Sequence, residues 1–310
     1  MKTAAILPIE SARPLAVAVG FFDGVHRGHL AVIHEALAAA HDGSFDSCVF
    51  SFSMNGDGPA GKRDAGLLQS SSLKAHAIEE LGVNWLLTPP FSELRGLSPE
   101  AFALDVLYWG MGARVVCCGY DYRFGRGAAA GPEELRALLA PRGVRVIQVG
   151  AVLDEGEPVS STRIRAALRQ GDCETAGRLL GRPYAIDFEV THGRGLGKTI
   201  GFPTINQPYG ENDLRPRFGV YATWAMVDGI PYPAVTNVGV KPTVGSNGVS
   251  AESYIEGFSG DLYGKRVETR FIQFLRPEQK FGSIDALRDA IGADSVRAQE
   301  LLKQKKPKSH

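Results

Sequence analysis

LAVAVGFFDGVHRGHL, residues 15–30, decides the fold of the first half of this chain. An apolar run typical of a buried strand leads through a glycine-rich turn into a helical pattern. His26 and His29 lie in this turn, and Gly28 between them lets a backbone or a phosphate come close. Two imidazoles beside a helix N-terminus can donate hydrogen bonds to a nucleotide phosphate and stabilise charge that develops on it. The alternative is a pair of ordinary surface histidines.

Apolar runs alternate with helical patterns through the rest of the first half. This alternation predicts an α/β domain, a doubly wound parallel sheet with helices on both faces. Ligands in such folds bind beyond the carboxyl ends of the strands. The expected strands are 15–20, 47–52, 84–89, 113–119 and 144–150, and the expected helices are about 29–40, 72–82, 98–109 and 132–140.

The pattern changes after GRPY, residues 181–184. Apolar and polar residues now alternate, as in YAIDFEVTH, and Asp228-Gly229 indicates a hairpin between two strands. No helical pattern returns until about residue 283. We therefore expect an antiparallel β-barrel closed by terminal helices, and two domains, residues 1–180 and residues 181–310.

Composition excludes several classes of protein. The 310 residues include 34 Lys plus Arg and 34 Asp plus Glu, so net charge gives no bias toward nucleic acid or a membrane. Four cysteines are too few and too scattered for a disulfide framework or a zinc site. The N-terminus lacks the features of a signal peptide, and no run of about 18 apolar residues occurs. These features predict a cytoplasmic protein that binds neither nucleic acid nor membrane, and they leave self-association open.

Two further motifs of the first half point to an anion. VSSTRIRAAL, residues 159–168, places Arg163 and Arg165 in the first turn of a helix, where cations oppose the helix dipole. A bound anion would remove this conflict, although two solvated arginines are the alternative. CGYDYRFGRG, residues 118–127, follows the fourth expected strand, so Asp121 and Arg123 lie where a nucleotide site is expected.

HGRGLGKTIGFPTIN, residues 192–206, nearly matches a P-loop. A P-loop has four residues between its first Gly and Gly-Lys-Ser/Thr, but only three separate Gly193 from Gly197. A helix must also follow, and Pro203 lies only four residues after Thr199. This stretch is therefore not a P-loop.

Together these motifs carry a family resemblance. GFFDGVHRGH, GYDYRFGRG and SSTRIR resemble, in order and spacing, the adenylyltransferase module of the bacterial bifunctional riboflavin kinase/FAD synthetase family. The near-P-loop, GVYATW, TNVGVKPTVG, AESYIEGFSGDLYGK and LRPEQKFGS resemble its riboflavin kinase module. The resemblance implies phosphorylation of riboflavin to FMN by ATP and adenylylation of FMN to FAD with release of pyrophosphate. Riboflavin, FMN and ATP are thus the implied small-molecule partners.

For the adenylyl transfer, the resemblance implies that His26, His29 and Arg165 are catalytic and that Asp121 and Phe124 bind the flavin. The phosphate of FMN would attack the α-phosphorus of ATP. The implied ATP-binding residues are Gly20, Phe22, Asp23, Gly24, His26, His29, Ser161, Thr162 and Arg165.

For the kinase, the resemblance implies that Glu252 is the base that takes the proton of the ribityl 5′-hydroxyl. Thr204 and Asn206 would hold Mg²⁺, a hard cation that prefers oxygen ligands. Gly197, Lys198 and Thr204 are the implied ATP-binding residues, and Arg276 and Phe281 lie on the implied flavin side.

One departure leaves an alternative open. Family members carry Phe-x-Pro-His-Pro at the end of the second strand, whereas this chain has FSMNG, with Asn55 in the position of the His. A monofunctional riboflavin kinase with an inactive or altered N-terminal module is therefore the alternative function. A non-enzymatic flavin-binding protein and a nucleotidylyltransferase for another substrate are more distant alternatives.

Overall fold

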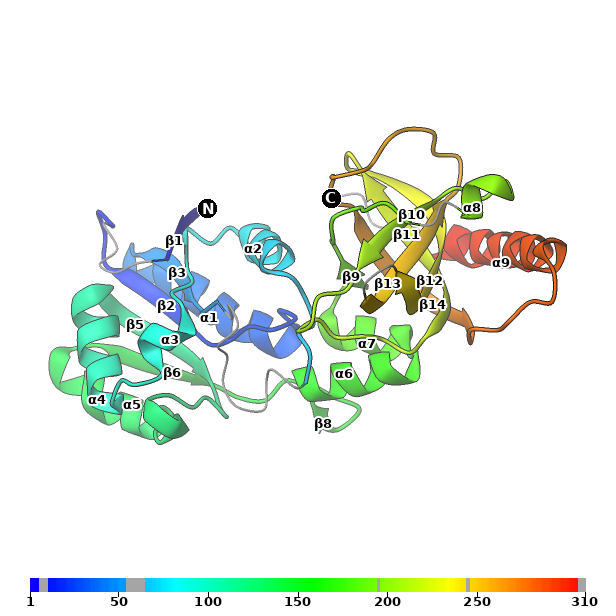
Figure 1. The fold of residues 1–310 in the computed structure, drawn as a ribbon. Coiled ribbons are helices and arrows are strands. Elements are labelled where there is room, and N and C mark those ends of the chain that lie inside the picture. The colour runs from blue at the N-terminus through cyan, green and yellow to red at the C-terminus, as the bar shows by residue number, and fades with distance from the viewer. Residues whose placement is uncertain (6–10, 54–64, 194–195, 244–245, 306–310) are drawn as a thin grey trace. The chain divides into compact units, whose positions relative to one another are not determined.

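A computed structural model describes residues 1–5, 11–53, 65–193, 196–243 and 246–305; the side chains of Leu196, Lys198 and residues 241–247 lie outside this description. The chain divides into two compact units, Met1–Leu67 with Ser71–Ser161, and Leu68–Ser70 with Thr162–His310 (Figure 1). The domain boundary at residues 180/181 stays a prediction.

The first unit is built on a six-stranded sheet in which every strand pair is parallel, in the order β1-β4-β3-β2-β5-β6. The five predicted strands are confirmed, and the short edge strand β1 was not predicted. The strands are β1 (Lys2–Ala4), β2 (Leu15–Val19), β3 (Asp46–Phe50), β4 (Trp85–Leu87), β5 (Ala113–Gly119) and β6 (Arg145–Val149).

Helices follow the strands as the alternation predicts. The expected helix at 98–109 is α4 continued by a π-helix, η1, in which each hydrogen bond spans one residue more than in an α-helix. The helical segments are α1 (Arg27–Gly43), α2 (Ser71–Glu79), α3 (Phe91–Leu94), α4 (Pro99–Ala101), η1 (Phe102–Gly110), η2 (Arg126–Ala128), α5 (Pro132–Leu139) and η3 (Ala140–Arg142), and a small hairpin joins β7 (Leu153–Asp154) to β8 (Glu157–Pro158).

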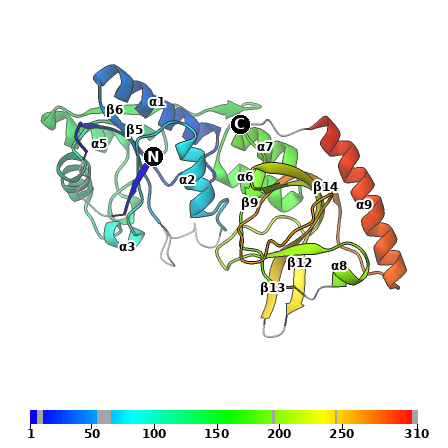
Figure 2. The ribbon, with the colours of Figure 1, turned by 90° about the horizontal axis from the view of Figure 1, so that it is seen from above.

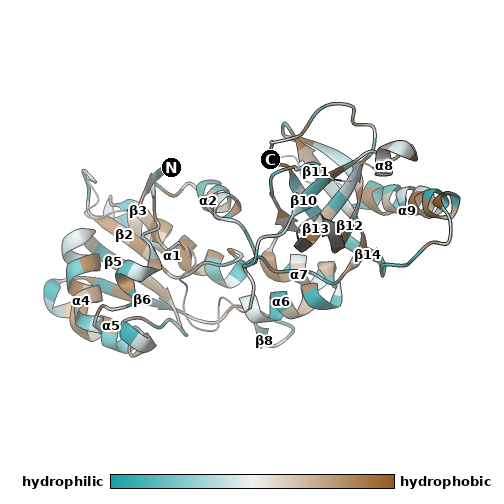
Figure 3. Cartoon of the chain, viewed as in Figure 1, coloured by the Kyte–Doolittle hydropathy of each residue, from teal (hydrophilic) through white to brown (hydrophobic). Residues whose placement is uncertain are grey.

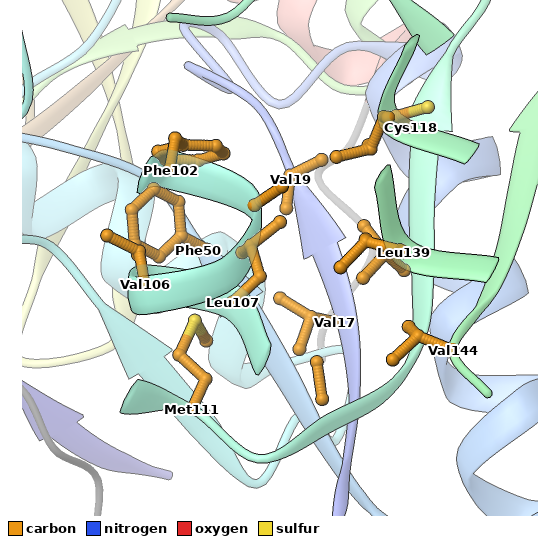
Figure 4. Close-up of a cluster of buried hydrophobic side chains, with 14 of the residues drawn as sticks. Val17, Val19, Phe50, Phe102, Val106, Leu107, Met111, Cys118, Leu139 and Val144 are labelled. Atoms are coloured by element: carbon orange, nitrogen blue, oxygen red, sulfur yellow. The ribbon is translucent and has the colours of Figure 1, made fainter. Parts of the chain in front are cut away.

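Each face of this sheet buries its own core, because successive side chains of a strand point to opposite faces. Val17 and Val19 pack on one face with η1 and α5 (Figure 4). Ala16 and Ala18 pack on the other face with α1 and α2. Figure 3 shows the hydrophobic colouring of the central strands. Burial raises the pKa of the Cys118 thiol to about 11, so this cysteine is a protonated, apolar member of the core.

The second unit is built on an antiparallel six-stranded sheet in the order β10-β13-β12-β11-β14-β9. The predicted hairpin at Asp228-Gly229 is confirmed, since both residues have positive φ and join β11 directly to β12. The elements are α6 (Ser161–Gln170), α7 (Cys173–Leu180), β9 (Tyr184–Ile186), α8 (Leu196–Thr199), β10 (Thr204–Pro208), β11 (Gly219–Val227), β12 (Ile230–Thr243), β13 (Ser246–Ile255), β14 (Glu268–Arg276) and α9 (Ile284–Gln304).

The chain after β9 joins the two edges of this sheet. Glu189 bridges to Arg266, next to β14, and Thr191 bridges to Asn206 of β10, so the sheet curls on itself as predicted. The long helix α9 lies along its outer face (Figures 1 and 2), where Ala298 and Leu302 cover Trp224. Among the helices that the structure describes, none is long and apolar enough to cross a membrane.

Buried hydroxyl groups on the inner face fix how three strands pair. Thr236 Oγ1 lies 2.7 Å from Thr223 Oγ1 and 2.8 Å from Ser253 Oγ, which links β11, β12 and β13. All three side chains are fully buried. A shift of one residue in the pairing would break these hydrogen bonds and move every side chain to the opposite face. The buried hydroxyls of the inner face therefore also fix the strand register that aligns the side chains of the outer face.

Candidate nucleotide and flavin sites

The turn after β2 places the two predicted histidines against each other. His26 is the N-cap of α1, and its Nδ1 accepts a hydrogen bond from the backbone N–H of His29 over 3.3 Å. The two rings stack with their centroids 3.5 Å apart. Because Nδ1 of His26 accepts, a neutral His26 carries its proton on Nε2, where it can donate to an anion. The structure thus brings His26 and His29 together at the start of a helix.

A glycine leaves room for the stacked rings, and the turn before it has unusual backbone angles. A Cβ on Gly28 would lie 3.2 Å from Cε1 of His26 and 3.5 Å from the carbonyl oxygen of Val159, so a side chain there would press on the ring. Phe22, Gly24 and Val25 all have positive φ, which is uncommon for the two residues that are not glycine. Such strain is typical of functional turns.

The SSTRIR motif meets this turn through its second serine. Ser161 Oγ donates a hydrogen bond of 2.9 Å to the carbonyl oxygen of Asp23, whose side chain is buried. Arg165 belongs to the second unit and is also buried, with an exposed fraction of 6%.

The sequence reasoning missed Lys74 of α2, a cation that lies near the turn. Its Nζ donates to the carbonyl oxygen of Phe21 over 2.9 Å and lies 3.3 Å from Ser51 Oγ. It therefore ties together the chain segments that leave β2 and β3. Asn55, the residue of the FSMNG departure, lies outside the described residues.

The predicted flavin residues of the first unit lie in different surroundings. Asp121 is exposed in a tight turn closed by a hydrogen bond of 3.1 Å from Tyr122 N to Gly119 O. Phe124 is buried in the core, with its ring centroid 5.6 Å from that of Phe102. Their contact with a flavin stays a prediction, and Phe124 has an evident structural role.

In the second unit, one row of directly paired residues crosses the outer face of the sheet. Glu252 of β13 pairs with Asn206 of β10 on one side and with Asn237 of β12 on the other. The row continues through Val220 of β11 to Arg276 of β14. Directly paired Cα atoms in antiparallel strands lie about 4.5–5.5 Å apart. Three predicted residues that are far apart in the sequence thus share one row.

Thr204 and Asn206 fit the predicted cation site. They are two residues apart on β10, so their side chains lie on the same face as Glu252. Asn206 Nδ2 donates a hydrogen bond of 3.0 Å to Thr191 Oγ1, which leaves the amide oxygen of Asn206 as the atom for a cation. A hydroxyl and an amide oxygen are ligands that suit Mg²⁺.

The near-P-loop does not have P-loop geometry. The single helical turn α8 contains Gly197 and Thr199 instead of following them, and it ends before β10. The backbone N–H of Phe202 donates to Gly197 O over 2.8 Å, which folds the segment back on itself. The side chain of Lys198 lies outside the described part of the chain.

Arg276 is held by the C-terminal helix. Its Nε donates to both carboxylate oxygens of Asp294, over 3.1 and 3.0 Å, and its Nη2 donates to Oδ2 over 2.7 Å. Its guanidinium lies 5.6 Å from the ring centroid of Phe281. Most of the donors of Arg276 are therefore used within the chain, and its place beside a flavin stays a prediction.

Sequence reasoning missed Asn237, Thr191 and Asp294. Both segments, TNVGVKPTVG and AESYIE, were recognised in the sequence, but only the register of β12 against β13 sets Asn237 opposite Glu252. Asp294 lies on a helix whose place on the barrel comes only from tertiary packing.

Comparisons with known proteins find a family match for each part of the chain. A family model for FAD synthetase matches residues 9–163, and a family model for riboflavin kinase matches residues 180–302. A bifunctional riboflavin kinase/FMN adenylyltransferase from Pseudomonas fluorescens is 35% identical, with 93% of each chain covered. The protein of the same name from Bacillus subtilis is 32% identical over 93% of each chain.

A solved structure of similar fold covers nearly the whole molecule. It is named a macrolide-efflux protein from Streptococcus pneumoniae, and it superposes with a TM-score of 0.83 at 29% identity over 96% of this chain and 99% of that chain. The two family matches and the full-length relatives together settle the family. The chain belongs to the bifunctional riboflavin kinase/FMN adenylyltransferase family.

Proposed function

We propose that this chain phosphorylates riboflavin to FMN with its second unit and adenylylates FMN to FAD, with release of pyrophosphate, through the histidine turn of its first unit. The observation that carries the proposal is the row Asn206–Glu252–Asn237 across three paired strands. It sets a carboxylate between a candidate cation site and a second polar side chain. A base beside a cation-bound phosphate is what phosphoryl transfer to a hydroxyl requires.

In the kinase step, Glu252 accepts the proton of the ribityl 5′-hydroxyl as that oxygen attacks the γ-phosphorus of ATP, the bond from this phosphorus to the β,γ-bridging oxygen breaks, and ADP leaves. Bound Mg²⁺ would neutralise charge on the β- and γ-phosphates. Thr204 Oγ1 and the amide oxygen of Asn206 are its proposed ligands, and Gly197 and Lys198 of the near-P-loop are proposed to contact ATP. Phe281 and Arg276 line the proposed flavin side.

In the adenylyl transfer, the phosphate of FMN attacks the α-phosphorus of ATP, and pyrophosphate leaves. His26 and His29 donate hydrogen bonds to the charge that develops on the α-phosphate. Ser161 holds the turn through Asp23, and Arg165 supplies a cation to the phosphates. The remaining proposed ATP contacts are Gly20, Phe22, Gly24 and Thr162.

The test is to incubate the purified chain with riboflavin, ATP and Mg²⁺ and to separate the flavins over time. We expect FMN to form first and FAD to follow. Accumulation of FMN without FAD would favour the monofunctional alternative raised by FSMNG. The match of the FAD synthetase model over residues 9–163 supports two activities over that alternative.

A further inference from the structure

A second carboxylate lies beside the row, in the loop that follows β14. Glu278 Oε1 accepts a hydrogen bond from Asn237 Nδ2 over 3.3 Å. A Cβ on Gly239, two residues further along β12, would lie 2.8 Å from Oε2 of Glu278 and would overlap its carboxylate. The absence of a side chain at Gly239 therefore leaves the space in which this carboxylate lies.

Ser250 adds an unsatisfied polar group to the same place. It pairs directly with Gly239 across β12 and β13, and it lies two residues before Glu252, on the same face. Ser250 Oγ is buried, with the residue only 5% exposed, and it has no hydrogen-bond partner in the described part of the chain. A buried hydroxyl without a partner is costly, which points to a polar group of a ligand.

The loop that carries Glu278 is fixed at its start. Arg276 Nη1 donates to the carbonyl oxygen of Pro277 over 3.2 Å, while Asp294 holds the rest of the guanidinium. The ion pair is mostly buried, with 21% of the Arg276 side chain and 10% of the Asp294 side chain exposed. Glu278 is therefore placed by the end of β14 and by α9, and its exposed side chain is directed to Asn237.

The order of the strands separates the two substrates of the kinase. The proposed cation ligands are on β10, on one side of Glu252. Phosphoryl transfer needs the donor and the acceptor oxygens roughly in line. An acceptor whose terminal hydroxyl reaches Glu252 therefore extends away from β10, along β12. Asn237 of β12 and Glu278, which accepts its hydrogen bond, lie on that side, and Ser250 lies on β13 itself, opposite Gly239 and two residues before Glu252.

We propose that Glu278, together with Asn237 and Ser250, binds hydroxyl groups of the ribityl chain and so selects flavins that carry a polyol chain. A carboxylate accepts hydrogen bonds from neighbouring hydroxyls, the amide of Asn237 both donates and accepts, and Ser250 Oγ gains a partner. This inference rests on the proposed kinase function and adds a specificity-determining subsite to it.

The test measures binding of two flavins by quenching of their fluorescence, with MgADP present. Riboflavin carries the ribityl chain, and lumiflavin carries a methyl group in its place. Because hydrogen bonds to charged groups are strong, Glu278→Ala should weaken riboflavin binding roughly tenfold or more. Lumiflavin binding should change less than twofold. Glu278→Gln should lie between, since a neutral amide oxygen still accepts a hydrogen bond.

Glu211→Ala is the matched control, because Glu211 is an exposed carboxylate of the same unit, and it should leave both affinities unchanged. Equal weakening of both flavins by Glu278→Ala would overturn the inference, because the carboxylate would then contact the ring. No change in either flavin would also overturn it, leaving Glu278 as a loop anchor. Turnover of riboflavin by the wild type is measured in parallel. Selective loss of riboflavin binding without wild-type turnover would contradict the kinase proposal alone.

Discussion

The two histidines of the first unit come from one continuous turn, whereas the proposed kinase residues of the second unit come from separate strands. His26 and His29 are three residues apart, and the start of α1 sets their geometry. Asn206, Glu252 and Arg276 lie on three strands that are far apart in the sequence, and only the strand register aligns them. The first site depends on local backbone conformation, and the second depends on the hydrogen bonding of the whole barrel.

This difference predicts how each site responds to change. A substitution in the turn should affect only the adenylyl transfer. A substitution in the row should affect only the kinase activity, because each residue of the row is held by its own strand. The buried hydroxyls of Thr223, Thr236 and Ser253 keep the strands in register when an outer residue changes.

The largest effect should come from Glu252→Gln. The change removes the proposed base while it keeps the size of the side chain, and loss of a general base typically costs about 10²–10⁴-fold in rate. Riboflavin phosphorylation should fall by that factor, and FAD formation from supplied FMN should stay within twofold of wild type. Glu300→Gln, at an exposed position of α9, is the control. A fall of less than about threefold in phosphorylation would show that another group takes the proton.

His29→Ala should have the next largest effect, on the other activity. Removing one hydrogen-bond donor to developing charge typically costs about 10²–10³-fold in turnover. FAD formation from FMN should fall by that factor, with ATP binding affected less, and riboflavin phosphorylation should be unchanged. His34→Ala is the control, since His34 is an exposed histidine of the same helix α1. If wild type makes FAD no faster than His29→Ala does, the first unit is catalytically silent and the monofunctional alternative holds.

The same contrast explains what could be predicted from the sequence. The alternation of strands and helices, the Asp228-Gly229 hairpin and the place of the two histidines at a helix start are local patterns, and the structure confirms them. Asn237 was missed because its place opposite Glu252 depends on the register of two strands, and no single segment contains that information. Asp294 was missed because an acidic residue in a helix is ordinary until the helix is placed on a barrel. Tertiary contacts determine where both residues lie.

The smallest effect should come from Thr191→Val, which tests whether Thr191 orients the side-chain amide of Asn206. Thr191 Oγ1 accepts the hydrogen bond from Asn206 Nδ2, while the backbone N–H of Thr191 donates to Asn206 O over 2.8 Å. Valine keeps the backbone bond and the shape but removes the acceptor. The amide of Asn206 then loses the partner that directs its oxygen to the proposed Mg²⁺. Groups that orient metal ligands typically contribute 10–100-fold to metal affinity, so this half-buried position should show about tenfold.

The measurement is the Mg²⁺ concentration for half-maximal riboflavin phosphorylation. Thr191→Val should raise it about tenfold, with the rate at saturating Mg²⁺ and the adenylyl transfer unchanged. Thr199→Val is the decisive comparison, because in a P-loop the hydroxyl after the lysine binds the metal. Here α8 contains Thr199, and Thr204 and Asn206 are the proposed ligands, so Thr199→Val should shift the Mg²⁺ requirement less than twofold. The opposite order, with Thr199→Val the more damaging change, would restore the P-loop interpretation and remove Asn206 from the metal site.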